Sequence, residues 1–320
     1  MQKTTVWVLV ILILFSACRE EKGIPEAIAN RPVALNVLRF DKEFAGATPA
    51  TLPQIKQKYP YFFPPQYSDS VWIAKLQDSI QMELRQAVDS TFTDFKEQEE
   101  ELTLLFKHIT YYFPNYQVPT LITLTTDVDY ENRIILTDSL LLIGLDNYLG
   151  KDHRFYAGID RYIAKGLEKE YLQSDIVSAL SKKIIPYPEN RSFLAQMVYY
   201  GKELYLKDLL LSWQSDEQKI GYEPNELVWA EANEEQIWRY FIERELLFST
   251  DTKLGPRFLD PAPFSKFRLE LDNESPGRLG RYMGWKIVRA FMERTSTPVS
   301  ELWNLPAETI FKQSNYKPQK

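Results

Sequence analysis

Cysteine and histidine, the side chains that most often bind transition metals or serve in nucleophilic catalysis, are scarce in this sequence. It contains one cysteine, Cys18, and two histidines, His108 and His153. A zinc site draws on about four such ligands, and a serine triad needs a histidine beside its serine. We expect His108 to pack within a helix and His153 to lie solvated in a loop. The sequence therefore predicts no metal, no cofactor, no triad and no internal disulfide.

Carboxylates are the remaining candidates for chemistry. A glycosidase-type hydrolase needs two of them facing each other across a cleft, one with a raised pKa. Acidic residues are concentrated at 97–101 and 231–245, but such runs are typical of solvated helix faces. Asp272 and Glu274 precede Ser275-Pro276-Gly277-Arg278, a pattern that predicts a helix capped by Ser275, with Arg278 paired nearby. A metal-independent envelope hydrolase using these two carboxylates is the alternative.

The N-terminus has the pattern of a secretory signal. Lys3 precedes an apolar run at 6–15, which Ser16-Ala17-Cys18 follows. This run is about half the length that a membrane-spanning helix needs. Leu-Phe-Ser-Ala-Cys resembles a lipobox, so we expect a signal peptide (1–17) cleaved before Cys18 and a lipidated tether (18–32). An ordinary cleaved signal and a short anchor helix are the alternatives. Acyl chains on Cys18, at about 0.8 kcal/mol per buried methylene, would hold the chain at a membrane.

Composition narrows the possible partners. The chain of 320 residues has a formal net charge of −6, and its 7 Trp, 19 Tyr and 18 Phe make it rich in aromatic side chains. Acidic residues outnumber basic ones and no basic patch alternates with aromatics, so nucleic acid is not an expected partner. The aromatic content favours a packed interior and a groove over disorder.

The spacing of apolar residues predicts an α+β fold. Strands are expected at 33–40, 120–125, 133–136 and 140–145, with a turn at 137–139. Helices are expected at 71–88, 94–112, 158–170, 173–184, 192–211, 225–248, 278–294 and 299–313. We expect a single globular domain over 33–320. Helices and a small sheet would form its part 33–157, and helices would dominate 158–320.

Three glycines near the C-terminus are spaced as if on one helix face. Gly277, Gly280 and Gly284 recur at intervals of three and four. Glycine costs about 1 kcal/mol against alanine inside a helix, so its repeated use indicates close approach of another backbone. Tyr282 and Trp285 would pack alongside. Tight packing in the core and the wall of a binding groove are both compatible with this pattern.

Several stretches of the second half carry a family resemblance. They are 197–205 (MVYYGKELY), 220–222 (IGY), 235–242 (EQIWRYFI), 263–267 (PFSKF) and 272–285 (DNESPGRLGRYMGW). In this order they resemble the gliding-motility lipoprotein GldB family of Bacteroidetes, and the resemblance extends over nearly the whole chain. It implies a cell-envelope lipoprotein needed for gliding, in a system tied to the type IX secretion machinery.

That family is in turn distantly similar to gluzincin-type metallopeptidases, whose His-Glu-x-x-His helix and a later glutamate bind zinc. In the expected alignment Val177 and Ser181 replace the histidines, Ser178 replaces the general base and Tyr200 replaces the third ligand. Residues 154–320 contain no histidine. The resemblance therefore implies a degenerate zincin-like architecture, a pseudoenzyme that has lost its zinc ligands.

The resemblance implies a binding role for an inherited aromatic groove. We expect a protein or peptide segment in a groove formed by Tyr199, Tyr200, Gly201, Lys202, Tyr222, Trp238, Asp272, Glu274, Arg278, Gly280, Gly284 and Trp285. The expected partners are other gliding and secretion proteins of the envelope. The lipid anchor would lie in the inner or outer membrane, with the folded part facing the periplasm. A solute-binding lipoprotein is a further alternative, although repeated strand-helix-strand lobes are missing.

Overall fold

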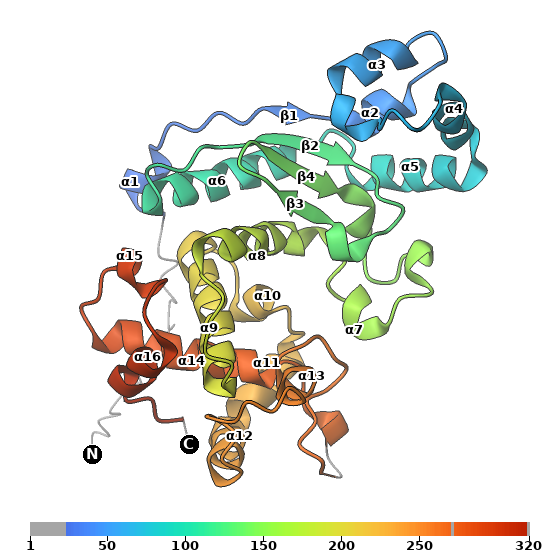
Figure 1. The fold of residues 1–320 in the computed structure, drawn as a ribbon. Helices are drawn as coiled ribbons and strands as arrows, with labels where there is room; N and C mark the ends of the chain where they lie inside the picture. Colours follow the sequence, from blue (N-terminus) through green and yellow to red (C-terminus); the bar gives the residue numbers. More distant parts are fainter. Residues whose placement is uncertain (1–23, 270–271, 319–320) are drawn as a thin grey trace, which may run out of the picture.

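The computed structural model describes residues 24–269 and 272–318. Cys18, the expected signal peptide and the first part of the tether lie outside the described residues. Within the described ranges, every helix is too short or too polar to cross a bilayer. Figure 1 shows an α+β architecture in which a small sheet lies at one end and helices form the rest, which confirms the expected fold class.

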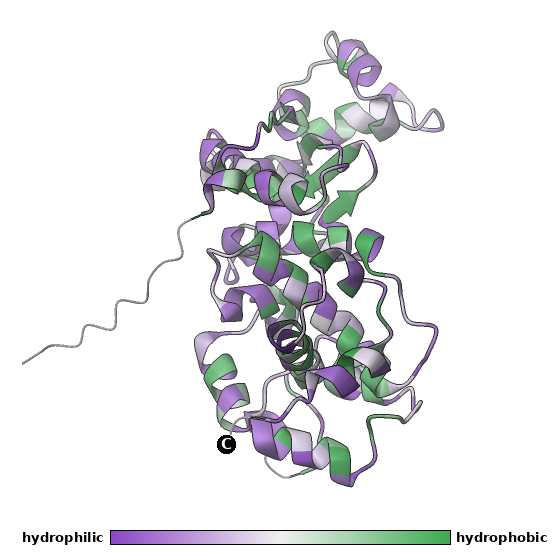
Figure 2. Cartoon of the chain, turned by 90° about the vertical axis from the view of Figure 1, so that its left-hand side faces the viewer, coloured by the Kyte–Doolittle hydropathy of each residue, from purple (hydrophilic) through white to green (hydrophobic). Residues whose placement is uncertain are grey.

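The sheet comprises β1 (Val37–Leu38), β2 (Thr120–Leu124), β3 (Ile134–Leu136) and β4 (Leu140–Gly144), in the order β1-β2-β4-β3. β2 is parallel to β1 and β4, whereas β3 is antiparallel to β4 across the turn at 137–139. Figure 2 shows these strands as largely hydrophobic. The three later strands and their turn are confirmed. The first expected strand, 33–40, is wrong over most of its length because only its Val37–Leu38 segment pairs with β2.

In the described residues one short α-helix precedes β1 and four more short α-helices lie between β1 and β2, where aromatic residues pack against the sheet. These helices are α1 (Glu26–Ala29), α2 (Phe40–Ala45), α3 (Leu52–Lys58), α4 (Asp69–Gln77) and α5 (Ser79–Thr91). Phe40, Phe44 and Tyr59 form a small core with Ile122 of β2. The single helix expected at 71–88 is wrong, since the chain breaks at Asp78. The Asp78 carboxylate accepts a hydrogen bond from the Gln81 amide at 2.9 Å and so caps α5.

Two longer helices connect the sheet to the helical part. α6 (Lys96–Tyr112) and α8 (Leu172–Ile184) contact each other, and α8 also contacts β3, beneath the sheet in Figure 1. Their apolar residues join one core cluster that extends from Val88 to Ile310. Between them lies α7 (Arg161–Ala164). The longer helix expected at 158–170 is wrong, because the chain turns after α7 and continues as a short 3-10 turn at Lys169–Tyr171.

The helical part is built around α9 (Phe193–Leu210), which confirms the helix expected there. It begins at Ser192, whose hydroxyl accepts from the Ala195 amide. α9 is apolar on most of its circumference, as befits a buried helix, and it packs against α14 (Leu279–Arg294). The remaining helices are α10 (Asp216–Ile220), α11 (Pro224–Ala232), α12 (Glu234–Glu243), α13 (Leu254–Phe258), α15 (Val299–Leu302) and α16 (Ala307–Ser314).

Two helices expected as single are divided in the structure. The expected helix 225–248 is α11 and α12, separated at Asn233, whose side-chain amide donates to the Trp229 carbonyl. The expected helix 299–313 is α15 and α16, separated by a segment that ends in Pro306. Proline cannot donate the backbone hydrogen bond that would continue the first helix.

The expected close approach of two backbones is confirmed where α9 crosses α14. A Cβ added to Gly284 would lie 1.8 Å from the Met197 carbonyl oxygen, and one on Gly201 would lie 2.3 Å from the Gly284 oxygen. Gly280 lies against the Phe258 carbonyl in the same way. The prediction that all three glycines share one helix face is wrong for Gly277, which precedes α14 and lies against Ala262.

Candidate functional site

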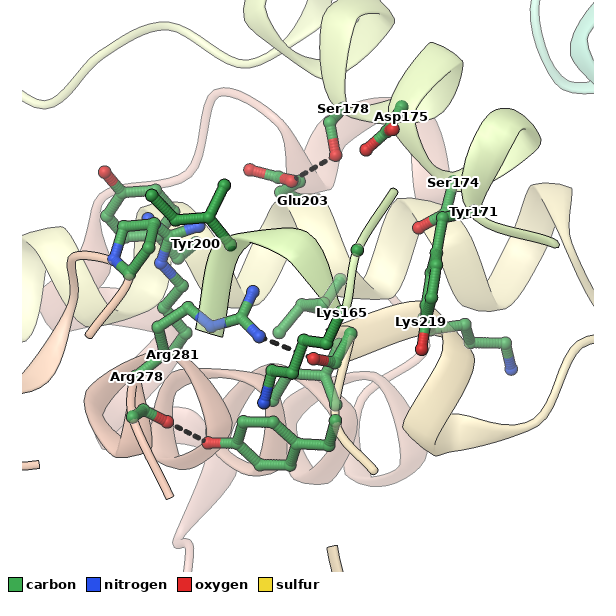
Figure 3. Close-up of a pocket in the computed structure, with 18 of the residues that line it drawn as sticks. Lys165, Tyr171, Ser174, Asp175, Ser178, Tyr200, Glu203, Lys219, Arg278 and Arg281 are labelled. Carbon is green, nitrogen blue, oxygen red and sulfur yellow. Dashed lines mark hydrogen bonds between the residues drawn. The ribbon is translucent and has the colours of Figure 1, made fainter. Parts of the chain in front are cut away.

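A pocket of about 720 Å³ opens between α8 and the helical part. Its walls come from α8, α9, the segment after α10 and the start of α14, with the α7 region on another side. Figure 3 shows polar side chains from these separate elements directed toward a common space. This volume lies in the range of about 300–1,000 Å³ that is typical of sites for small molecules or short peptide segments.

The α8 wall is polar because this helix is amphipathic. Ser174, Asp175 and Ser178 line the pocket, whereas Val177 faces the core and is fully buried. Ser181 is also buried, and its hydroxyl donates to the Ser178 carbonyl. Val177 and Ser181, which were aligned with the peptidase histidines, therefore do not line this pocket. The pair that faces it at a spacing of four is Ser174 and Ser178.

The α9 wall presents Tyr200, Glu203, Leu204 and Lys207, which are spaced by three, one and three residues along one helix face. The Ser178 hydroxyl donates to Glu203 Oε1 at 2.7 Å, a bond that joins the two walls (Figure 3). Lys207 Nζ lies 3.7 Å from Glu203 Oε1 and donates to the Lys219 carbonyl at 3.0 Å. Burial lowers the pKa of Lys207, and the nearby Glu203 opposes that effect. The Glu203 carboxylate is thus already engaged by Ser178 and Lys207.

The Asp175 carboxylate, like that of Glu203, is engaged by neighbouring side chains. Its two oxygens accept from Arg133 Nε at 2.6 Å and from an Arg133 terminal nitrogen at 2.8 Å, while the Tyr148 hydroxyl donates at 2.9 Å. Burial and the neighbouring Asp175 charge raise the pKa of the Tyr148 hydroxyl well above its usual value, so it remains a donor. A carboxylate with these three bonds is a poor general base, because protonation would break a bidentate ion pair.

The start of α14 contributes two guanidinium groups. Arg278 has a left-handed backbone with φ of 59°, and its side chain donates to the Gly221 carbonyl at 2.7 Å beside the Tyr222 ring. The Arg281 guanidinium stacks over Tyr200, with its carbon 3.8 Å from the ring centre. Burial lowers the pKa of Arg278, and the charge of Arg281 adds to this effect.

Of the expected groove residues, the structure brings Tyr200, Tyr222 and Arg278 together in the pocket. Tyr199 contacts the Tyr200 ring edge-on without lining the cavity. Gly201, Gly280 and Gly284 serve the helix packing instead. The expected groove is therefore displaced toward α8 from the position that the family motifs alone suggested.

The two tryptophans of the expected groove lie elsewhere. Trp285 is 1% exposed, and its indole N–H donates to Asp208 at 2.8 Å. Trp238 packs edge-on against Tyr316, near the C-terminus. Neither ring lines the pocket.

The acidic motif before α14 shapes a loop. The Asp272 carboxylate accepts from the backbone amides of Phe267, Arg268 and Leu269, and neither Asp272 nor Glu274 lines the pocket. The expected cap is wrong: the Ser275 hydroxyl donates to the Asp272 and Ser265 carbonyls, and Ser275 lies four residues before the first residue of α14. The expected pairing of Arg278 with these acids is also wrong, because its guanidinium reaches the Gly221 carbonyl.

Lys202, another expected groove residue, is buried on the far side of α9. Its Nζ donates to the Trp303 and Leu305 carbonyls at 2.9 and 2.8 Å, and burial lowers its pKa to about 8. The unfolded chain has a lysine pKa of about 10.4. Between these values the folded protein has released this proton and the unfolded chain has not, so stability rises with pH there.

We therefore expect wild-type protein to gain stability relative to Lys202→Met between pH 7.5 and 9.5, by up to about 2 kcal/mol. Urea unfolding of both proteins at the two pH values measures this difference. A gap that does not change with pH would show that the two carbonyls keep Lys202 charged throughout.

The sequence reasoning missed most of the pocket. Lys165, Tyr171, Glu203 and Arg281 line it and were not among the expected residues. One signal for Glu203 was available: Tyr200, Glu203 and Lys207 recur at helical spacing on one face of a largely apolar helix. No comparable pattern marked the α7 region, which reaches the pocket only through tertiary packing.

The histidines are remote from this site. His108 is 1% exposed, with Nδ1 3.1 Å from the Leu209 carbonyl oxygen, and burial lowers its pKa, so the expected packed histidine is confirmed. His153 was expected to be solvated but is half-buried, stacked on Phe155. In the described ranges, His, Cys, Asp and Glu side chains form no group of three or more arranged to hold a metal ion.

One of the comparisons with known proteins supports the family resemblance. No curated protein and no solved structure matches the chain significantly. A family model described as "Gliding motility protein GldB" matches residues 21–318. Because this match extends over nearly the whole sequence, the chain belongs to the GldB family of gliding motility proteins.

Proposed function

We propose that this gliding motility protein is a non-catalytic lipoprotein of the cell envelope that works by holding a segment of another protein in its pocket. The expected tether, 18–32, would link the fold to the membrane through acylated Cys18. The expected signature of that anchor is palmitate labelling that Cys18→Ala abolishes. The partner belongs to the gliding and secretion machinery. Support for a binding role comes chiefly from the pocket itself, which is large enough for a ligand but already has its main carboxylates engaged.

Two features argue against hydrolysis in this pocket. The Asp175 and Glu203 carboxylates are occupied by Arg133, Tyr148, Ser178 and Lys207. The pair considered for a metal-independent hydrolase, Asp272 and Glu274, is outside it. A residue that must exchange protons with substrate works best when it is free to approach it, so these ion-paired groups suit positioning better than acid-base catalysis.

Photo-crosslinking in gliding cells tests the binding role. A photoreactive phenylalanine analogue at Tyr171, which lines the pocket, is expected to crosslink a defined envelope protein. The matched control is the same analogue at Phe248, an aromatic residue that is 62% exposed outside the pocket, where no such product is expected. Mass spectrometry of the product identifies the partner and the crosslinked segment.

Two crosslinking results would contradict the binding role. Equal crosslinking from both positions, or none from Tyr171, would remove the support for a partner in the pocket. Purified protein is expected to leave peptidoglycan fragments and peptides intact. Turnover that Asp272→Asn or Glu274→Gln abolishes would instead establish the hydrolase.

A further inference from the structure

The pocket carries an excess of positive charge although the whole chain is acidic. Among the described residues that line it, seven are basic and three are acidic, in a chain of net charge −6. Some of the basic groups are already neutralised, because Arg133 pairs with Asp175 and Lys165 pairs with Glu226 outside the pocket. Lys207 and Lys219 pair with Glu203 and Asp208, and Lys182 is exposed, so the remaining charge inside the pocket is concentrated at the start of α14.

Arg278 and Arg281 supply that remaining charge. In the described residues neither guanidinium makes an ion pair, and each donates one hydrogen bond to a backbone carbonyl, of Gly221 and Leu259 respectively. A guanidinium has five N–H donors in a rigid fork. Stacking of Arg281 on Tyr200 and the position of Arg278 beside Tyr222 fix both planes and leave further donors available. Such preorganised forks match carboxylate and phosphate geometry.

The positive charges of Arg278 and Arg281 also lower the pKa values of neighbouring lysines. The charge of Arg278 helps to lower the pKa of Lys165, where burial is the main cause. Arg278 and Arg281 act in the same direction on Lys207, again after burial. An anion bound at the guanidinium groups would relieve this repulsion and would be attracted in a partly desolvated site.

We propose that Arg278 and Arg281 form a subsite for a carboxylate of the bound partner segment, contributed by an acidic side chain or a chain terminus. This inference rests on the proposed function, since it specifies the chemistry of the segment. The size of the pocket exceeds the needs of a small inorganic ion. Tyr171 and Tyr200, which are only partly buried, offer ring surface to a peptide, and Ser174 offers it a hydroxyl from α8.

The distribution of charge favours a peptide over a polyphosphate. Glu131, Asp175 and Glu203 also line the pocket. Because Asp175 pairs with Arg133 and Glu203 with Lys207, these two basic groups are not available to a ligand with several negative charges. A peptide carries isolated carboxylates together with amide donors. It can therefore place its charge at the arginines and its amides near the acidic residues and serines.

Titration calorimetry with a defined probe tests the subsite. The probe is acetyl-Tyr-Gln-Gln with a free carboxyl terminus, which is its single carboxylate, added to the full-length protein in detergent. Its comparison peptide is acetyl-Tyr-Gln-Gln amide, which has nearly the same shape and no charge. The acidic probe is expected to bind at least tenfold more tightly, and its affinity is expected to fall as salt screens the arginines.

Arginine variants locate the binding. Arg281→Gln and Arg278→Gln are each expected to weaken binding of the acidic probe at least tenfold. Arg281→Lys is expected to lose most of the affinity despite keeping the charge, because lysine lacks the planar fork. Arg257→Gln is the matched control: Arg257 also donates to a backbone carbonyl and stacks on an aromatic ring, but it does not line the pocket. Circular dichroism confirms that each variant is folded.

The outcomes separate this inference from the proposed function. Equal affinity for the acidic and neutral peptides, or no loss in either glutamine variant, would overturn the carboxylate subsite. Inorganic phosphate that binds more tightly than the peptide would overturn it in favour of a phosphate ligand. Crosslinking from Tyr171 that persists in Arg278→Gln and Arg281→Gln cells would refute the subsite while the partner-binding role stands. Absence of crosslinking in wild-type cells would refute the role itself.

Discussion

Gly284→Ala is expected to lower the free energy of unfolding by about 3 kcal/mol or more, near the upper end for overpacking a protein interior. The new Cβ would lie 1.8 Å from the Met197 carbonyl oxygen and 2.4 Å from its carbonyl carbon. Both atoms belong to the backbone of α9, so no side-chain rotation can relieve the clash. The two helices must separate, and the apolar contacts between them weaken. Urea unfolding measures the loss.

Gly158→Ala is the control for this substitution, because an added Cβ there has no neighbour within 4 Å. Its effect is expected to stay within about 0.5 kcal/mol. Gly201→Ala provides a second test from the facing helix, since its Cβ would lie 2.3 Å from the Gly284 oxygen. If Gly284→Ala were as stable as Gly158→Ala, the close crossing of α9 and α14 would be incorrect.

The same crossing connects stability to the site. Arg281 lies one turn before Gly284 on α14, and Tyr200 immediately precedes Gly201 on α9. The glycines therefore set the distance between the two walls that bring Arg281 over Tyr200. The glycine motif was compatible with core packing or with a groove wall. It packs the core directly, and it positions the pocket wall through the neighbouring residues Tyr200 and Arg281.

Sequence reasoning succeeded for elements whose apolar spacing is strong and uninterrupted. Helix α9 and strands β2 and β4 were predicted nearly to the residue because each is long, apolar and bounded by clear turn or cap residues. Sequence reasoning failed where a helix is interrupted although the apolar spacing continues. The Asp78 side chain caps the start of α5, and the Asn233 side chain donates to the Trp229 carbonyl at the end of α11. Neither bond changes the surrounding apolar spacing.

The site was predicted less well than the fold for a different reason. Motif residues such as Trp285 and Gly284 pack in the interior. Their distinctive pattern therefore indicates close packing and does not mark the pocket. The pocket forms where α7, α8, α10 and α14 meet, and no local pattern encodes that meeting. Arg278 and Arg281 both stand in the motif at 272–285, but only Arg278 was expected at the site. Tertiary contacts with Tyr200 and Leu259 give Arg281 its orientation.

Glu234→Ala is expected to destabilise the protein by about 3–5 kcal/mol, the usual cost of removing one member of a buried ion pair. The Glu234 side chain is 1% exposed. It accepts from the Tyr282 hydroxyl at 2.8 Å and the Tyr316 hydroxyl at 2.6 Å, and Lys286 Nζ lies 3.2 Å away. Alanine would leave two hydroxyls and an ammonium group without their acceptor. Burial, together with Glu234, raises the pKa of both tyrosines, so they remain donors at any ordinary pH.

The neighbouring residue offers a matched control. Glu235 pairs with Arg239 one turn along α12, with 38% of its side chain exposed, so Glu235→Ala is expected to cost at most about 0.5 kcal/mol. Glu234→Gln, which keeps the size and one acceptor oxygen, is expected to fall between the two. Because Glu234 connects Tyr316 to α14, its loss should also expose the C-terminal segment to limited proteolysis before global unfolding. Equal stability of Glu234→Ala and Glu235→Ala would show that this buried carboxylate does not hold the C-terminal segment against the helix that carries Arg278 and Arg281.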